Sequence, residues 1–157
     1  MVQLSAGILG DRNRMSYDAG ISYIRNVFEA TRTLQKNPDD LDARGIIMMG
    51  ASLSTSSRLG IGKEEPFAYE IYELEFLPEK LFGSSYRRSL TSVFPRFLQA
   101  MGKHHADDIR KYYHDAFGID SSIEESSRKL VELFEGFGVE MYYDGKITRE
   151  QVDAIPC

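Results

Sequence analysis

Residues 16–38 of this 157-residue chain read SYDAGISYIRNVFEATRTLQKNP, and this stretch decides the fold class. Apolar side chains recur in it at steps of three and four positions: Ile21, Ile24, Val27, Phe28 and Leu34. Such spacing places apolar side chains on one face of an amphipathic helix. Ser16 can cap this helix, and Asn37-Pro38 ends it because proline disfavours helical backbone in the residue before it. The stretch therefore predicts a long helix with one apolar face.

The same pattern continues towards the C-terminus. It predicts helices at 39–53, 64–77, 85–101, 106–117, 120–138 and from 148 onward. Pro78 should bend or break the helix at 64–77, and Pro95 should kink the helix at 85–101. The segment 139–143 is expected to be a short strand or an extended loop.

Two further expectations concern the domain organisation. Small side chains on several faces of the helix at 39–53 predict that it is central and buried. Residues 1–15 lack a clear period, so we expect a poorly ordered lead-in there. Residues 16–157 should then form a single all-α domain, an orthogonally packed bundle of six to seven helices.

Composition narrows the function classes. Hydrophobic residues make up 42% of the chain, the net charge is −5 and the pI is 5.2. Nucleic-acid binding would need a basic stripe and a high pI, so we expect no nucleic-acid partner. No apolar run is long enough to span a bilayer, and the first residues do not resemble a secretory signal. The sole cysteine is Cys157, so no internal disulfide is expected. These features together favour a cytoplasmic protein.

Two longer strings resemble a known family. Residues 37–62 read NPDDLDARGIIMMGASLSTSSRLGIG, and residues 65–101 read EPFAYEIYELEFLPEKLFGSSYRRSLTSVFPRFLQAM. Together with the order of the predicted helices, they resemble the helical C-terminal domain of iron-containing alcohol dehydrogenases, in the butanol dehydrogenase-like branch. The resemblance covers about residues 18–155. It implies an all-α domain that is truncated at both ends relative to the family.

The resemblance also implies a function. In that family a nucleotide-binding domain precedes the helical domain, and NAD(P), a divalent metal such as iron and the alcohol bind between the two. Histidines of the helical domain hold the metal, and the matching positions here are Glu70, Leu74 and Ser84. Leucine offers no ligand atom and serine is a poor ligand, so this chain is expected to hold no metal and no cofactor by itself.

Other residues could carry chemistry, and each also has a structural explanation. The three histidines, His104, His105 and His114, lack metal-ligand spacing on one helical face, which favours surface positions. The string Gly60-Ile61-Gly62-Lys63 lacks the full phosphate-loop pattern, so a helix-ending turn is favoured. Several carboxylates could form an acid–base site or a solvated helix face: Glu64, Glu65, Glu70, Glu73 and Glu75. Several aromatic residues could line a pocket, although core packing is favoured: Tyr69, Tyr72, Phe76, Phe82 and Tyr86. Arg87-Arg88 could bind an anion or form an exposed pair.

The sequence leaves two functions open. The first is the substrate-cleft and metal-cleft domain of an NAD(P)-linked alcohol/aldehyde oxidoreductase, inactive by itself. Its uncovered cleft face, built around Tyr69, Glu70, Leu74 and Ser84, would bind a nucleotide-binding domain or a second copy of the chain. The alternative is a stand-alone, non-catalytic helical protein-interaction module.

Overall fold

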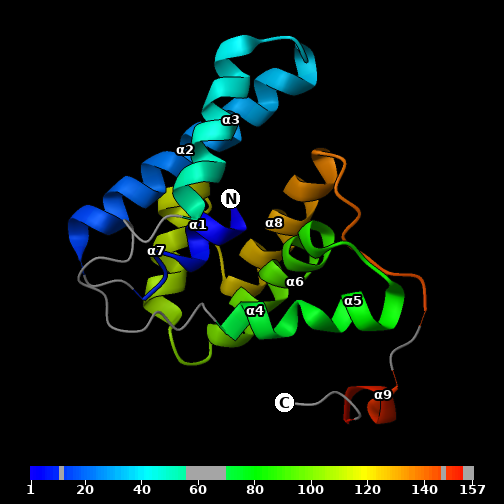
Figure 1. The fold of residues 1–157 in the computed structure, drawn as a ribbon. Coiled ribbons are helices and arrows are strands. Elements are labelled where there is room, and N and C mark those ends of the chain that lie inside the picture. The colour runs from blue at the N-terminus through cyan, green and yellow to red at the C-terminus, as the bar shows by residue number, and fades with distance from the viewer. Residues whose placement is uncertain (11–12, 56–69, 146–147, 154–157) are drawn as a thin grey trace.

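The computed structural model describes residues 1–10, 13–55, 70–145 and 148–153, and within them the only regular elements are helices (Figure 1). The helices are α1 (Val2–Ala6), α2 (Arg14–Lys36), α3 (Leu41–Ser54), α4 (Ile71–Leu74), α5 (Phe76–Phe82), α6 (Tyr86–Met101), α7 (Ala106–Phe117), α8 (Ile123–Gly136) and α9 (Arg149–Asp153). The predicted all-α fold class is therefore confirmed. No helix among the described residues is long and apolar enough to cross a membrane.

Side-chain caps explain where several helices begin. The side chain of Asn13 accepts hydrogen bonds from the backbone N–H groups of Met15 and Ser16, so α2 begins two residues before the predicted cap at Ser16. Either Asp39 or Asp40 was expected to begin the next helix, and Asp40 caps α3 by accepting from the N–H of Ala43 at 2.9 Å. At its other end, α7 stops at Gly118, whose φ of +66° is left-handed and suits a glycine.

The N-terminal segment differs from the expected poorly ordered lead-in. Helix α1 lies in the core, and the apolar residues of this segment are almost fully buried: Val2, Leu4, Ala6, Ile8 and Leu9. The Ser5 hydroxyl hydrogen-bonds the hydroxyl of the buried Tyr112 at 2.6 Å. A helix of only five residues is too short to show a period in the sequence, and burial of its apolar side chains holds it in place.

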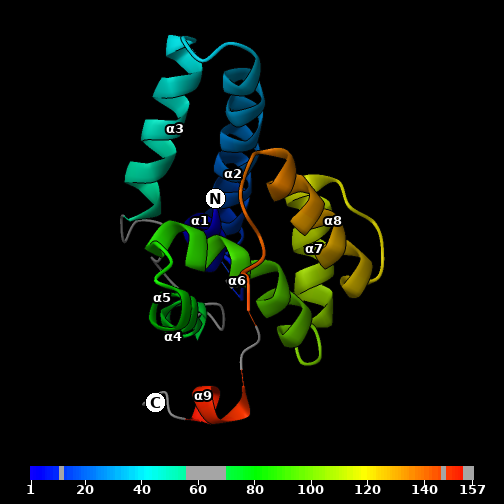
Figure 2. The same ribbon diagram turned by 90° about the vertical axis from the view of Figure 1, so that its right-hand side faces the viewer.

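Helix α3 also differs from expectation, because it is not central. The antiparallel pair of α2 and α3 extends beyond the rest of the molecule in both views (Figures 1 and 2). Only Ala43 and Gly50 of α3 are buried. A Cβ at Gly50 would lie 2.5 Å from a side-chain methyl of Val27 on α2, so this small residue permits close packing on one face only.

The predicted break at Pro78 lies elsewhere. Helices α4 and α5 meet at Glu75, and Pro78 lies in the first turn of α5, where backbone N–H groups have no partner within the helix. This split and α1 add helices to the expected six or seven. Helix α6 continues through Pro95, and residues 139–143 form an extended loop rather than a strand. The start of the predicted helix at 64 and the loop at 59–62 lie outside the described residues.

Candidate functional site

The three positions that match the family's metal ligands lie in different environments. Glu70 is exposed, and the side chain of Leu74 carries no donor atom. The Ser84 hydroxyl is hydrogen-bonded to the Tyr143 hydroxyl at 3.0 Å. The described part of the chain contains no group of three or more His, Cys, Asp or Glu that could hold a metal ion. These residues do not fit a divalent metal. Tyr69, the fourth residue of the expected cleft face, lies outside the described residues.

The histidines are not brought together either. His105 and His114 lie near opposite ends of α7, about 14 Å apart along the helix axis, which is too far for both to ligate one ion. His104 is exposed, and the His114 ring pairs with Asp120 at 2.8 Å. The surface interpretation therefore suits His104 and His114.

The carboxylates of α4 and α5 separate into two environments. Glu70 and Glu73 are exposed, as expected for a solvated helix face. Glu75 is only 4% exposed, and within the described part of the chain its Oε2 atom has no hydrogen-bond partner. Burial raises the pKa of Glu75, and the nearby Glu79 carboxyl raises it further. The sequence held one signal for this burial: Glu75 lies four residues after Ile71 and three before Pro78, both buried, so helical spacing puts it on their face.

The aromatic residues and the arginine pair also divide. Phe76 and Tyr86 are exposed, so the core-packing interpretation is wrong for these two rings. Phe82 stacks on Tyr143 with ring centroids 4.8 Å apart. Arg87 is exposed, whereas Arg88 donates to two backbone carbonyls of the 139–143 loop and lies 4.4 Å over the Tyr143 ring. Arg88 thus fastens that loop to α6.

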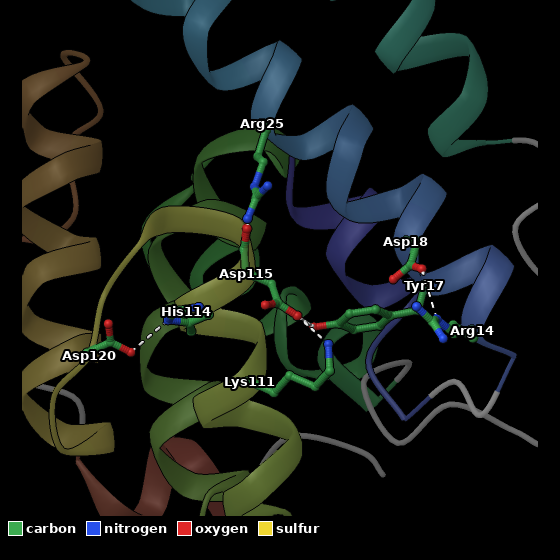
Figure 3. A network of polar contacts seen from close by, with 8 residues as sticks. All are labelled: Arg14, Tyr17, Asp18, Arg25, Lys111, His114, Asp115 and Asp120. Carbon is green, nitrogen blue, oxygen red and sulfur yellow. Dashed lines mark hydrogen bonds and ion pairs between the residues drawn. The ribbon is translucent and has the colours of Figure 1, made fainter.

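The structure instead brings together a cluster of polar side chains that the sequence did not suggest (Figure 3). The α2–α7 cluster consists of Tyr17 and Arg25 on α2 with Lys111 and Asp115 on α7. The Tyr17 hydroxyl donates to the Asp115 carboxylate at 3.0 Å, and Lys111 forms an ion pair with the same carboxylate. The Lys111 ammonium lies 4.0 Å from the centroid of the Tyr17 ring, and the Arg25 guanidinium donates to the Asp115 carbonyl.

The charges and hydrogen bonds of the α2–α7 cluster hold the two helices together. Burial by itself would raise the pKa of Asp115, but hydrogen bonds from Lys111 and Tyr17 outweigh it and hold that pKa below its usual value. Burial and the Asp115 charge raise the pKa of Tyr17 far above its usual value. The carboxylate therefore stays ionised and the phenol stays protonated near neutral pH. Neither group is poised to exchange a proton with a substrate.

Three hollows lie one after another along the interface between α2 and α7. The first, of about 600 Å³, shares Tyr17, Asp18 and Lys111 with the second, of about 410 Å³. The second shares Arg25 with the third, of about 660 Å³, which extends to α8. We call the third the basic hollow; its lining is Arg25, Phe28, Glu29, Arg32, His114, Ala116, Phe117, Gly118, Ile119, Lys129 and Leu133.

The lining of the basic hollow combines apolar side chains with charged ones. Phe28 and Phe117 meet edge to face with centroids 5.9 Å apart. The Arg32 guanidinium lies 4.4 Å over the Phe28 ring and also pairs with Glu29 at 3.1 Å. Lys129 donates to the Ser121 hydroxyl at 2.8 Å and forms no ion pair in the described structure. The hollow can therefore accept a ligand that is apolar on one side and anionic on the other.

Sequence reasoning missed this region because its parts are far apart along the chain. Tyr17 and Asp115 are separated by 98 residues. The one local signal was Lys111 and Asp115, four residues apart on one helical face, which is a common spacing for surface ion pairs. No protein-family model, curated protein or solved structure matches this chain.

Proposed function

We propose that this chain is a non-catalytic helical binding module whose basic hollow receives an acidic, partly apolar segment of a partner protein. The observation that carries the proposal is the combination of apolar and cationic side chains in the lining of this hollow. Three cationic residues, Arg25, Arg32 and Lys129, line the hollow beside one carboxylate, that of Glu29. This local excess of positive charge contrasts with the net charge of −5 for the whole chain.

The non-catalytic part of the proposal is supported by the neighbouring α2–α7 cluster. Its Asp115 carboxylate forms an ion pair with Lys111 and accepts a hydrogen bond from the Tyr17 phenol, so the polar side chains of the cluster satisfy one another. Such an arrangement stiffens the two helices that form the walls of the basic hollow. A stiff wall lowers the entropy that binding would otherwise cost.

Peptide selection tests this function. A displayed library of random peptides, selected on the purified chain, should yield peptides in which Asp or Glu flanks Leu, Phe or Tyr. The double variant Arg32→Glu/Lys129→Glu should raise the Kd of these peptides at least about tenfold, because it reverses two charges that line the hollow. A matched control, Arg87→Glu/Arg110→Glu, makes the same charge change at exposed positions outside the hollow. Equal loss in both variants would mean that net charge, and not the hollow, governs binding.

A second candidate follows from the resemblance to iron-containing alcohol dehydrogenases. The chain would form one wall of a substrate cleft, and a nucleotide-binding domain would supply NAD(P). One observation favours it: Leu74 of the expected cleft face is 38% exposed, and the nearby Phe76 is 54% exposed, which suits a surface that packs against another domain. If this face drives self-association, Leu74→Lys should weaken association while helicity by circular dichroism is retained. Association that ignores Leu74→Lys would count against this candidate.

A further inference from the structure

The outer face of α3 carries large apolar side chains that contact little else in the described structure. Leu41 is 78% and Met48 is 73% exposed. The opposite face of the helix packs on α2 through Ala43 and Gly50. Exposed apolar side chains grouped on one helical face are typical of an interaction surface.

The residues of this outer face have the spacing of a coiled-coil seam. Leu41, Gly45, Met48 and Ser52 follow one another at steps of four, three and four positions. We call these four residues the α3 seam. Large and small side chains alternate along it. A Cβ placed on Gly45 would meet nothing within 4 Å, so the space above this glycine is open.

This alternation is self-complementary in one orientation. If a second α3 lies antiparallel to the first, with its middle over the middle of the seam, Leu41 faces Ser52 of the second copy. Met48 then faces Gly45 of the second copy, and the two remaining pairs follow by symmetry. Every large side chain meets a small one, and the same patch serves both copies, as a two-fold interface requires.

We propose that a second copy of this chain packs antiparallel on the α3 seam and forms a homodimer. Charge is compatible with this arrangement, because none of the four seam residues is charged and no charged residue follows Arg44 within α3. Arg44, which lies beside the seam, is paired with Asp39 at 3.1 Å, so the dimer need not bury it as an unpaired charge. Antiparallel helices also oppose their dipoles favourably. The dimer surface belongs to α3 and is distinct from the basic hollow, so the failure of one proposal would not affect the other.

The size of the seam predicts a weak dimer. Helix α3 has 14 residues and is roughly 21 Å long, so the interface lies at the small end of specific interfaces. We expect the dissociation constant of the dimer to be on the order of micromolar. Sedimentation velocity should show a monomer–dimer equilibrium that shifts over this concentration range.

Three variants separate the α3 seam from other surfaces. Met48→Glu should weaken the dimer at least about tenfold, because it places a charge in the seam. Met15→Glu, at an 82% exposed methionine of α2, is the matched control and should leave the dimer intact. Leu74→Lys should also leave it intact. A wild-type chain that stays monomeric, or a dimer lost with Leu74→Lys but kept with Met48→Glu, would overturn the proposal.

Cross-linking tests the orientation. In a Cys157→Ser background, chains carrying Gly45→Cys are mixed with chains carrying Met48→Cys. The antiparallel seam predicts that the mixed disulfide forms faster than either homotypic disulfide, because these two positions face each other. Faster homotypic cross-linking would indicate parallel helices and would overturn the proposal. Gly45→Leu adds a further check. Met48 of the second copy packs on this glycine, so a leucine there should block the contact and leave the variant monomeric with undiminished helicity.

Discussion

Replacing Glu75 by glutamine should stabilise the protein at neutral pH. Glu75 is 4% exposed and its Oε2 atom has no hydrogen-bond partner among the described residues, so ionisation places a poorly compensated charge in the interior. A buried polar group without a partner costs about 1–3 kcal/mol, and a charged group costs more. Glutamine keeps the shape of the side chain and removes the charge. We therefore expect the free energy of unfolding to rise at pH 7, by about 1.4 kcal/mol for each unit by which burial raises the pKa of Glu75.

The sign of the pH dependence follows from the direction of the pKa shift. Burial raises the pKa of Glu75 above its usual value of 4.5, so the folded state holds this proton more tightly than the unfolded state. The contribution of Glu75 is then most favourable below about pH 4.5 and is lost as the pH rises through its folded pKa. Each unit by which the pKa is raised corresponds to about 1.4 kcal/mol.

Urea unfolding at a series of pH values between about 4 and 8 measures this difference. The advantage of Glu75→Gln over the wild type should grow with rising pH and then level off. Taking the difference between the two proteins cancels the titration of the other groups. Glu73→Gln is the matched control, because Glu73 is exposed on the same helical segment and should change stability little. A glutamine variant that is less stable than the wild type at pH 7 would refute the reasoning and show that the ionised carboxylate is favourably held.

Three further predictions concern the α2–α7 cluster and the packing of α3. Tyr17→Phe should lower the free energy of unfolding by about 1 kcal/mol, because it removes the hydrogen bond to the Asp115 carboxylate, whereas Tyr142→Phe at a 62% exposed ring should have little effect. Asp115→Asn should flatten the acid limb of the stability profile. The pKa of Asp115 is held below its usual value of 3.8, so its contribution is present above that pH and is lost as the pH falls through the folded pKa. Gly50→Ala should destabilise by about 1–3 kcal/mol because its Cβ would collide with a valine of α2, whereas Gly45→Ala, in open space, should stabilise by about 0.5–1 kcal/mol; thermal unfolding that ranks the two variants the other way would contradict the packing described for α3.

The candidate site shows how far a resemblance can guide the choice of residues. The resemblance points to Glu70, Leu74 and Ser84; of these, Glu70 is exposed, Leu74 has no ligand atom and Ser84 is hydrogen-bonded to Tyr143. The cluster of polar side chains that the structure does assemble joins Tyr17 to Asp115, which are 98 residues apart along the chain. Neither residue is unusual in its local sequence. Only the packing of α2 against α7 gives them a common environment.

The sequence by itself determined the helices whose signals are local. The helix at Ala106–Phe117 was predicted with both of its ends, because its apolar period and the glycine that stops it all lie within thirteen residues of chain. The start of α3 was likewise predictable, since the Asp40 side chain bonds a backbone group three residues away. Caps, turns and periodicity act over a few residues, and for this reason a linear reading can find them.

Tertiary structure decided which of these helices are covered. Helix α1 is buried although its sequence shows no period, and α3 extends outward although its small residues suggested the centre. Glu75 is buried while Glu73, two positions earlier, is exposed. Burial depends on which elements pack together from distant parts of the chain, and the free energy of that packing belongs to the whole fold. The covered and uncovered faces of this protein, and therefore its candidate binding surfaces, were decided at that level.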